Sequence, residues 1–267
     1  RAETVGDTVS FAVNRNINYT NICFHKCAFC AFSKGKTAAE LRGPAYDLDI
    51  EEVTRRTAEA WARGATEVCM QGGIHPHYTG RTYLDLLAAA KEGAPDIHVH
   101  AFSPLEVRHG AASLVIGLRT TATIMYGHIE RTDHQARHLL AIRALQARTG
   151  GFTEFVPLPF VAMEAPIYMK GRARPGPTFR EAVLMHAVAR LVLHPLIPNI
   201  QVSWVKMGEA GVRAALAAGV NDLGGTLMNE SISRAAGAAH GQEWPPEQME
   251  RVIREAGRLP MQRDTLY

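Results

Sequence analysis

Short apolar segments alternate along this chain with longer stretches whose apolar residues recur at helical spacing. Residues 9–19 alternate in polarity, with Val9, Phe11 and Val13 at every second position, and predict a strand or hairpin. Further strands are predicted at residues 67–70, 97–102, 120–126, 152–157, 200–205 and 220–223. The intervening helices are predicted at residues 49–63, 81–93, 133–148, 178–192, 209–218 and 245–257. Alternation of this kind implies a parallel sheet and an α/β fold.

The number of strands bears on the architecture. Seven predicted strands fit poorly with a closed β/α barrel of eight. Residues 103–119 are all that separates two of the strands, and they suffice for one parallel crossover. A closed (β/α)8 barrel and an open (β/α)6 barrel are therefore the alternatives. No Pro/Gly/Ser-rich linker divides the chain, so a single domain is expected over residues 1–267.

Local signals mark the ends of several elements. Three helix starts carry side chains that cap free backbone N–H groups, namely Asp49, Asp133 and Thr178. Pro157 and Pro159 are expected to form a stiff loop after the strand that begins at Phe152. Residues 161–177, rich in proline, glycine and arginine, are interpreted as a candidate lid.

Composition and charge exclude several classes of function. The 267 residues are 46% hydrophobic, which is enough for a sizeable core, and 29 basic against 26 acidic residues give a net charge of +3. The chain has no basic run with interleaved aromatic residues, the pattern that would indicate nucleic-acid binding. The chain contains neither a stretch of about twenty apolar residues, which would indicate a membrane span, nor a signal-peptide pattern. The clustered cysteines, taken as reduced, favour the cytoplasm.

Three of the four cysteines, Cys23, Cys27 and Cys30, lie within eight residues in a C-x3-C-x2-C pattern. Thiolates are soft ligands that suit iron–sulfur clusters, Zn²⁺ or Cu(I). Three of them can hold three irons of a [4Fe-4S] cluster and leave the fourth iron open. An open metal position is typical of a catalytic site. The loop also leaves the C-terminal end of the first predicted strand. In a β/α barrel, this end of the strands carries the chemistry.

Other readings of the cysteines compete with a cluster. His25 as a fourth ligand would make a zinc site, although such sites usually join two ligand pairs and no second pair is present. Cys27 and Cys30 alone could form a redox dithiol, which leaves Cys23 unexplained. A zinc or cluster protein used for structure or electron transfer is the non-enzyme alternative. Cys69 lies in an apolar strand and is interpreted as a buried structural cysteine.

Polar residues gather where the predicted strands end. Candidate substrate-binding or catalytic residues are His100, Tyr126, His128, Asn229 and Glu230. Asn14, Arg15, Asn16 and Asn18 make the first strand unusually polar, and they either face solvent or contact substrate or cluster. Asp222 is predicted to accept or donate hydrogen bonds inside the barrel.

Several segments together resemble one branch of the radical S-adenosylmethionine (SAM) enzymes. The segments are NRNINYTNICFHKCAFCAF (14–32), QGGIHP (71–76), TATIMYGHIE (121–130), VPLPF (156–160), NIQVSWVKMG (199–208) and GGTLMNESISRAAGA (224–238). This branch makes the deazaflavin coenzyme and, in sister enzymes, menaquinone. The last segment is most similar to the CofH-type half of FO synthase.

The resemblance implies cofactors and their contacts. Cys23, Cys27 and Cys30 would bind a [4Fe-4S] cluster whose open iron chelates the amino and carboxylate groups of SAM, so that electron transfer releases a 5′-deoxyadenosyl radical. Phe29 would lie against the adenine, and the backbone of Gly72 and Gly73 would meet the methionyl end. Gln71 and Ser103 are further candidate SAM contacts. The acidic residue usual after the glycines is Ile74 here, which is a departure from the family pattern.

The resemblance also implies the reaction. A hydrogen is taken from L-tyrosine, its Cα–Cβ bond breaks, and the 4-hydroxybenzyl fragment adds to 5-amino-6-(D-ribitylamino)uracil, leaving 2-iminoacetate. Implied partners are an electron donor such as ferredoxin or flavodoxin, and a CofG-type subunit or fused domain. The alternatives within the superfamily are an enzyme of the menaquinone branch and the CofG-type half itself.

The chain is shorter than the resemblance implies between Pro104 and Leu118. A further β/α unit of roughly thirty or more residues would supply the eighth strand of a closed barrel. We therefore expect a (β/α)8 barrel that lacks one unit, with the backbone discontinuous between His109 and Gly117.

Overall fold

The computed structural model describes residues 5–25, 27–33, 44–103, 105–106, 109 and 120–264. The strands are β1 (Thr8–Ala12), β2 (Asn14–Ile17), β3 (Glu67–Met70), β4 (His98–His100), β5 (Thr120–Tyr126), β6 (Phe152–Pro159), β7 (Asn199–Ile200), β8 (Asp222–Gly225) and β9 (Leu259–Gln262). The helices are α2 (Ile50–Ala62), α3 (Gly80–Gly93), α5 (Thr132–Thr149), α6 (Pro166–Met169), α7 (Phe179–Leu193), α8 (Trp204–Ala217), α9 (Ile232–Ala235) and α10 (Pro246–Glu255).

All the strand ladders are parallel, as the alternation of elements predicts. Their orders are β8-β1-β9, β2-β3-β4 and β5-β6-β7. Only Val13 separates β1 from β2, and single parallel bridges join Arg15 to Met228 and Gln201 to Asp222. The three sheets therefore follow one another as neighbours from β4 round to β5.

The arrangement is not a closed barrel within the described residues. No ladder joins β4 to β5 in that part of the chain, so the expected closed (β/α)8 wall is absent between these two strands. The predicted chain discontinuity lies outside the described residues, because residues 110–119 are not among them. The missing ladder falls between the two strands where the sequence is shorter than the resemblance implies.

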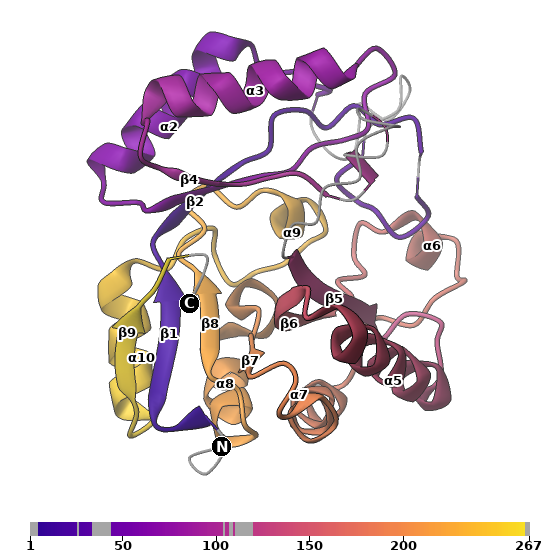
Figure 1. Ribbon diagram of the computed structural model, residues 1–267. Coiled ribbons are helices and arrows are strands. Elements are labelled where there is room, and N and C mark those ends of the chain that lie inside the picture. The colour runs from indigo at the N-terminus through magenta and orange to yellow at the C-terminus, as the bar shows by residue number, and fades with distance from the viewer. Residues whose placement is uncertain are drawn as a thin grey trace.

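Helices cover the outer side of the strands, with α2 and α3 along β2–β4 and the other long helices beside the remaining strands (Figure 1). The strand residues that face this layer are apolar and buried, and include Val9, Phe11, Val68, Phe155 and Leu223. Burial of such side chains is the dominant favourable term in folding. No helix in the described ranges is long and apolar enough to cross a membrane.

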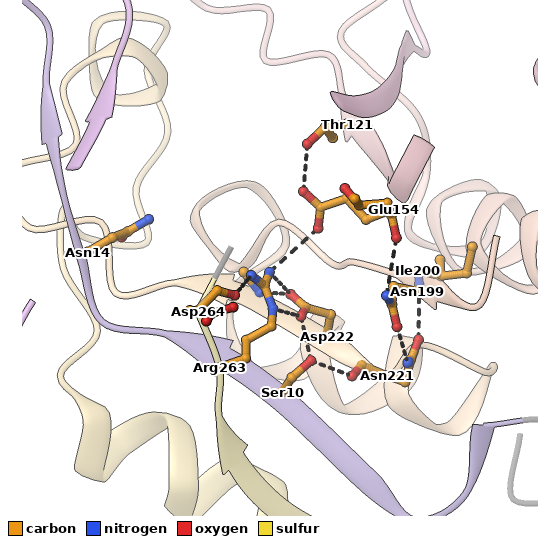
Figure 2. Close-up of polar contacts among 12 residues, drawn as sticks. Ser10, Asn14, Thr121, Glu154, Asn199, Ile200, Asn221, Asp222, Arg263 and Asp264 are labelled. Carbon is orange, nitrogen blue, oxygen red and sulfur yellow. Dashed lines mark hydrogen bonds and ion pairs between the residues drawn. The ribbon is translucent and has the colours of Figure 1, made fainter. Parts of the chain in front are cut away.

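The opposite side of the strands is polar (Figure 2). Arg263, which follows β9, lies with its Nε 2.5 Å from Asp222 Oδ2 and an Nη 3.5 Å from Glu154 Oε2. Ser10 Oγ donates to Asp222, and Thr121 Oγ1 donates to Glu154 at 2.7 Å. The prediction that Asp222 is an interior hydrogen-bonding residue is confirmed.

Two local predictions are wrong. Arg131, not Asp133, is the N-cap of α5, and Asp133 instead binds the Arg131 guanidinium at 2.9 Å. Pro157 and Pro159 lie inside β6 rather than in a loop after it. The short β7 pairs only with Glu154 and Phe155, so the prolines need no N–H toward that side.

The region after β6 differs most from expectation. A strand is predicted at residues 200–205, but β7 is only two residues long. The last two residues of the predicted strand, Trp204 and Val205, belong to α8. Gly208 interrupts α8 with a φ of 61°. Neither β9 nor the one-turn α9 is predicted by periodicity, since both are only four residues long.

Candidate active site

The cysteine loop, residues 23–30, follows β2 as the sequence predicts. Cys23, Cys27 and Cys30 are partly exposed free thiols. The N–H of Cys30 donates to the Cys27 carbonyl at 3.0 Å, and the N–H of Ser33 donates to Cys30 Sγ at 3.3 Å. An N–H directed at sulfur favours a thiolate, whereas burial raises the pKa of the Cys30 thiol.

The Gly72-Gly73 segment packs directly on this loop. The N–H of Gly73 donates to Thr20 O at 2.8 Å, and Ile74 O accepts from the N–H of Phe24 at 3.0 Å. A Cβ on Gly73 would lie 2.2 Å from the Ile22 carbonyl oxygen, and one on Gly72 would lie 2.4 Å from the Tyr19 ring. Both glycines are therefore required by contact with the chain itself, a reason that the sequence pattern did not reveal.

Glu106 ties three strand ends together at this site. Its carboxylate accepts from the N–H of Gly72 at 2.9 Å, from the N–H of Ser103 at 2.6 Å and from the Tyr19 hydroxyl at a shorter distance. Glu106 is 1% exposed. Sequence reasoning missed it, because a single glutamate after Ser103-Pro104 has no distinguishing local pattern.

The other side of the cysteine loop contacts the irregular stretch 161–177. The N–H of Ile167, in α6, donates to Ala28 O at 2.9 Å. Phe29 follows Ala28 in a turn and is 46% exposed, so its ring is accessible to a ligand. The stretch interpreted as a candidate lid therefore lies against the cysteine loop.

The donor set fits an iron–sulfur cluster. The three loop thiols are accessible and come from one short segment, and backbone N–H groups are available to sulfur, as at Cys30. Among the described residues no three His, Cys, Asp or Glu side chains gather tightly enough for a single metal ion. A cluster does not need such convergence, because each thiolate binds its own iron.

Cys69 belongs to a different region. It lies in β3, paired in register with Asn16 of β2 and His100 of β4. Burial and nearby carboxylates, Glu67 first, raise the pKa of its thiol far above the ordinary value. Cys69 is only partly buried, and its register partners Asn16 and His100 are polar, so the predicted fully buried position is wrong, while its structural role stays a prediction.

His100 projects from β4 toward Glu67, with its Nδ1 3.7 Å from Glu67 Oε1. Glu67 also accepts from Asn14 Nδ2 at 3.0 Å. The interaction with Glu67 raises the pKa of the His100 imidazole. This pair places a proton-holding group on the polar side of the strands.

Tyr126 and His128 have different surroundings. Tyr126 is 1% exposed and belongs to the hydrophobic core, and its hydroxyl has no hydrogen-bond partner among the described residues. Burial raises the pKa of this hydroxyl. His128 Nδ1 lies 3.0 Å from Glu130 Oε2, and its ring packs against Phe160. Glu130 also accepts from backbone N–H groups of its own turn, so it orders this loop.

Asn229 and Glu230 are neighbours with opposite exposure. Asn229 is exposed and adopts a left-handed conformation with φ of 64°. Glu230 is 4% exposed, and its carboxylate accepts from the N–H groups of Ser233 at 2.7 Å and Arg234 at 3.4 Å. Glu230 thus orders the start of α9. The five predicted substrate residues therefore do not form one cluster of equivalent side chains.

Two family models match this chain. Residues 17–115 match the radical SAM superfamily, and residues 149–267 match the CofH/MqnC C-terminal region. The chain is 44% identical to the 5-amino-6-(D-ribitylamino)uracil–L-tyrosine 4-hydroxyphenyl transferase of Methanopyrus kandleri, with 100% of this chain and 86% of that protein covered. It is 42% identical to FO synthase of Streptomyces coelicolor, of which it covers 36%.

Solved structures support the fold alone. Methylornithine synthase (PylB) matches with a TM-score of 0.66, 14% identity, and coverage of 97% of this chain and 86% of that one. HydG, a maturase of the [FeFe]-hydrogenase, matches with a TM-score of 0.64, 14% identity, and coverage of 97% and 65%.

The alignments with both sequence relatives span 320 positions, although the chain has 267 residues, so at least 53 aligned positions have no counterpart here. The missing β/α unit stays a prediction. Identity of this level over the whole chain identifies a family. The chain belongs to the radical SAM superfamily and, within it, to the CofH family of enzymes.

Proposed function

We propose that the chain joins the 4-hydroxybenzyl fragment of L-tyrosine to 5-amino-6-(D-ribitylamino)uracil in deazaflavin biosynthesis. The observation that carries this proposal is 44% identity over all of this chain to a transferase whose name states both substrates. The fragment leaves tyrosine by cleavage of the Cα–Cβ bond, and 2-iminoacetate is the second product. The polar inner side of the strands suits two polar substrates.

Cys23, Cys27 and Cys30 would hold a [4Fe-4S] cluster through their thiolates and leave one iron open to SAM. When bound, the cluster and SAM supply a 5′-deoxyadenosyl radical. The chain's own contribution is to hold the loop in place, since Gly73 and Ile74 bind the backbone on either side of Cys23. The Glu106 carboxylate would then position Gly72 for the methionyl end of SAM.

His100 is the proposed residue that binds substrate and holds a proton. Its imidazole faces the Glu67 carboxylate, which keeps it more readily protonated than a free histidine. A group held in this way can orient a polar substrate before reaction. Phe29, Gln71 and Ser103 remain proposed SAM contacts, and Tyr126, His128, Asn229 and Glu230 remain proposed residues of the substrate region.

Partners follow from the same proposal. The reaction needs one-electron reduction, so a ferredoxin or flavodoxin would deliver electrons. The chain covers 36% of the FO synthase of Streptomyces coelicolor, so we propose a CofG-type partner, as a subunit or a fused domain, for the remaining chemistry.

Anaerobic reconstitution and product analysis test the proposal. Cluster-loaded protein with SAM and a reductant should form the 4-hydroxybenzyl adduct only when tyrosine and the ribityl uracil are both present. Mass spectrometry should detect 5′-deoxyadenosine and 2-iminoacetate or its hydrolysis product. Turnover of futalosine-type substrates in place of this pair would instead assign the chain to the menaquinone branch.

A further inference from the structure

A second feature, which we call the amide groove, lies where β2 and β8 end. This cavity of about 550 Å³ is lined by carboxamide and hydroxyl side chains, including Asn16, Asn18, Tyr46, Asn229, Ser231 and Gln242. We propose that the amide groove binds 5-amino-6-(D-ribitylamino)uracil, the acceptor substrate. This inference rests on the function proposed above.

The groove lies at the end of the strands that carries the chemistry in β/α folds. Asn16 and Asn18 belong to β2 and its exit, and Asn229 and Ser231 follow β8. A smaller cavity of about 280 Å³ lies at the opposite ends of β1 and β8, beside Thr8 and Asn221. Location therefore favours the amide groove as a substrate site.

Part of the groove is held rigid by hydrogen bonds. Asn18 Nδ2 donates to Gln71 O at 3.1 Å, and its Oδ1 accepts from Ser231 Oγ at 2.7 Å. Gln242 Nε2 donates to Glu230 O at 2.7 Å. These contacts fix the walls before any ligand arrives, which reduces the entropic cost of binding.

Two other amides of the lining, Asn16 at its Oδ1 and Asn229, have no side-chain hydrogen-bond partner among the described residues. Asn16 Oδ1 is a buried oxygen that lacks any hydrogen-bond partner in the part of the chain that the structure describes. Buried polar atoms are nearly always partnered, so an orphan at a groove wall indicates a ligand or an ordered water. Asn229 is exposed, and no hydrogen bond of its side chain is found among the described residues.

The backbone beside Asn229 is also unusual. Leu227 and Asn229 have φ of 56° and 64°, a left-handed conformation that leucine rarely adopts. The N–H of Leu227 donates to Asn14 Oδ1 at 2.9 Å, which holds this turn against β2. Strain of this kind gathers at ligand sites, where surrounding contacts over-determine the conformation.

The chemistry of the lining matches a neutral ligand rich in amide and hydroxyl groups. A carboxamide presents one acceptor and two donors, which complements the N–H and C=O edges of a uracil and the hydroxyls of a ribityl chain. Arg15, Arg55 and Arg56 also line the groove and share the carboxylates of Glu52 and Glu59 at 2.7–2.8 Å, while Arg15 Nε has no hydrogen-bond partner among the described residues. No carboxylate is among the described residues that line the groove, so the groove offers no anionic partner for the ammonium group of a zwitterionic tyrosine.

The groove also adjoins the cysteine loop. Tyr46 N–H donates to Asn21 Oδ1 at 2.9 Å, and Asn21 is two residues before Cys23. A substrate in the groove is thus held beside the loop that we propose to bind the cluster. This position suits an acceptor that must meet a fragment generated near the cluster.

Binding measurements on cluster-loaded protein test the assignment without turnover. Calorimetric titration with the ribityl uracil, and separately with L-tyrosine, is compared for wild type, Asn16→Ala and Asn229→Gly. Glycine at 229 tolerates the positive φ, so this variant removes only the amide. Gln248→Ala, on α10 outside the groove, is the matched amide control.

Loss of one ligand hydrogen bond should raise Kd for the ribityl uracil about five- to tenfold in both groove variants. Kd for tyrosine, iron content and the Gln248→Ala values should not change. Unchanged ribityl uracil affinity, or equal weakening of both ligands, would overturn the groove assignment. If the wild type makes the adduct and both groove variants bind the ribityl uracil as tightly as it does, the groove assignment alone fails. A wild type that binds neither substrate and makes no adduct overturns the proposed function, and the groove assignment with it.

Discussion

The cysteine face and the packed body of this protein depend on different interactions. The cysteine face comprises the cysteine loop, Gly72, Gly73, Glu106 and residues 44–48. It is held by hydrogen bonds between backbone segments and by hydrogen bonds to the Glu106 carboxylate, and its glycines tolerate no side chain. The packed body comprises the strands, their helices and the Arg263 cluster, and it is held by buried apolar side chains and buried ion pairs.

This difference separates chemistry from stability. The three thiols of the cysteine face are partly exposed and accessible to a ligand. In the body, the buried carboxylates of Asp222 and Glu154 are bound by neighbouring side chains, as Figure 2 shows. Substitutions in the face should therefore alter cofactor binding, whereas substitutions in the body should alter unfolding.

The two kinds of cysteine give the largest predicted contrast. Cys27→Ala should abolish cluster assembly, because two thiolates cannot hold three irons of the cluster. Cys69→Ala should retain about four irons and four sulfides per chain after anaerobic reconstitution. Iron and sulfide analysis of both variants measures this. Stoichiometric zinc without sulfide in the wild type would refute the cluster.

The Arg263 cluster is predicted to be the most sensitive polar site of the body. Arg263→Ala leaves Asp222 and Glu154 buried without their cation and should cost about 3–5 kcal/mol of unfolding free energy. Arg258→Ala breaks the exposed pair with Asp7 and should cost about 0–1 kcal/mol. Anaerobic urea unfolding compares the two variants. Equal losses would show that the interior pair contributes no more than a surface pair.

Acid should weaken the body through His186. This side chain is 0% exposed, its Nδ1 lies 2.7 Å from Ala182 O, and burial lowers its pKa to about 4. The unfolded chain binds a proton near pH 6.5 that the folded chain refuses, so stability falls as pH drops from 6.5 toward 4, by about 3 kcal/mol. His186→Leu should remove this component from unfolding curves at pH 7 and 4.5. An identical pH dependence in both proteins would contradict it.

The smallest predicted effect concerns Glu106 on the cysteine face. Glu106→Gln keeps one acceptor oxygen but turns an NH2 group toward the N–H donors. The free energy of these hydrogen bonds should fall by about 1–3 kcal/mol. We expect weaker SAM binding, by roughly tenfold, with cluster content preserved. Equilibrium binding of SAM to reconstituted protein measures this. Glu51→Gln, on the exposed side of α2, is the control.

Much of the architecture could be predicted from local sequence pattern. Strands β3 and β5 and helices α2 and α7 have bounds within a residue or two of expectation, because apolar periodicity and the caps Asp49 and Thr178 act within a few residues. The elements that were missed, α6, α9 and β9, are each four residues long and too short to show a period.

The sequence by itself determined the cysteine motif, the alternation of strands and helices that implies parallel strands, and the family. Each of these depends on patterns within short segments of the chain. The tertiary structure alone decided which distant residues meet. Glu106 reaches Gly72 and Arg263 reaches Asp222, and Asn16 and Asn229 border one groove. Such contacts join segments separated by 34 to more than 200 positions, so no local spacing encodes them. The free energy of these contacts depends on burial and geometry, which only the folded chain creates.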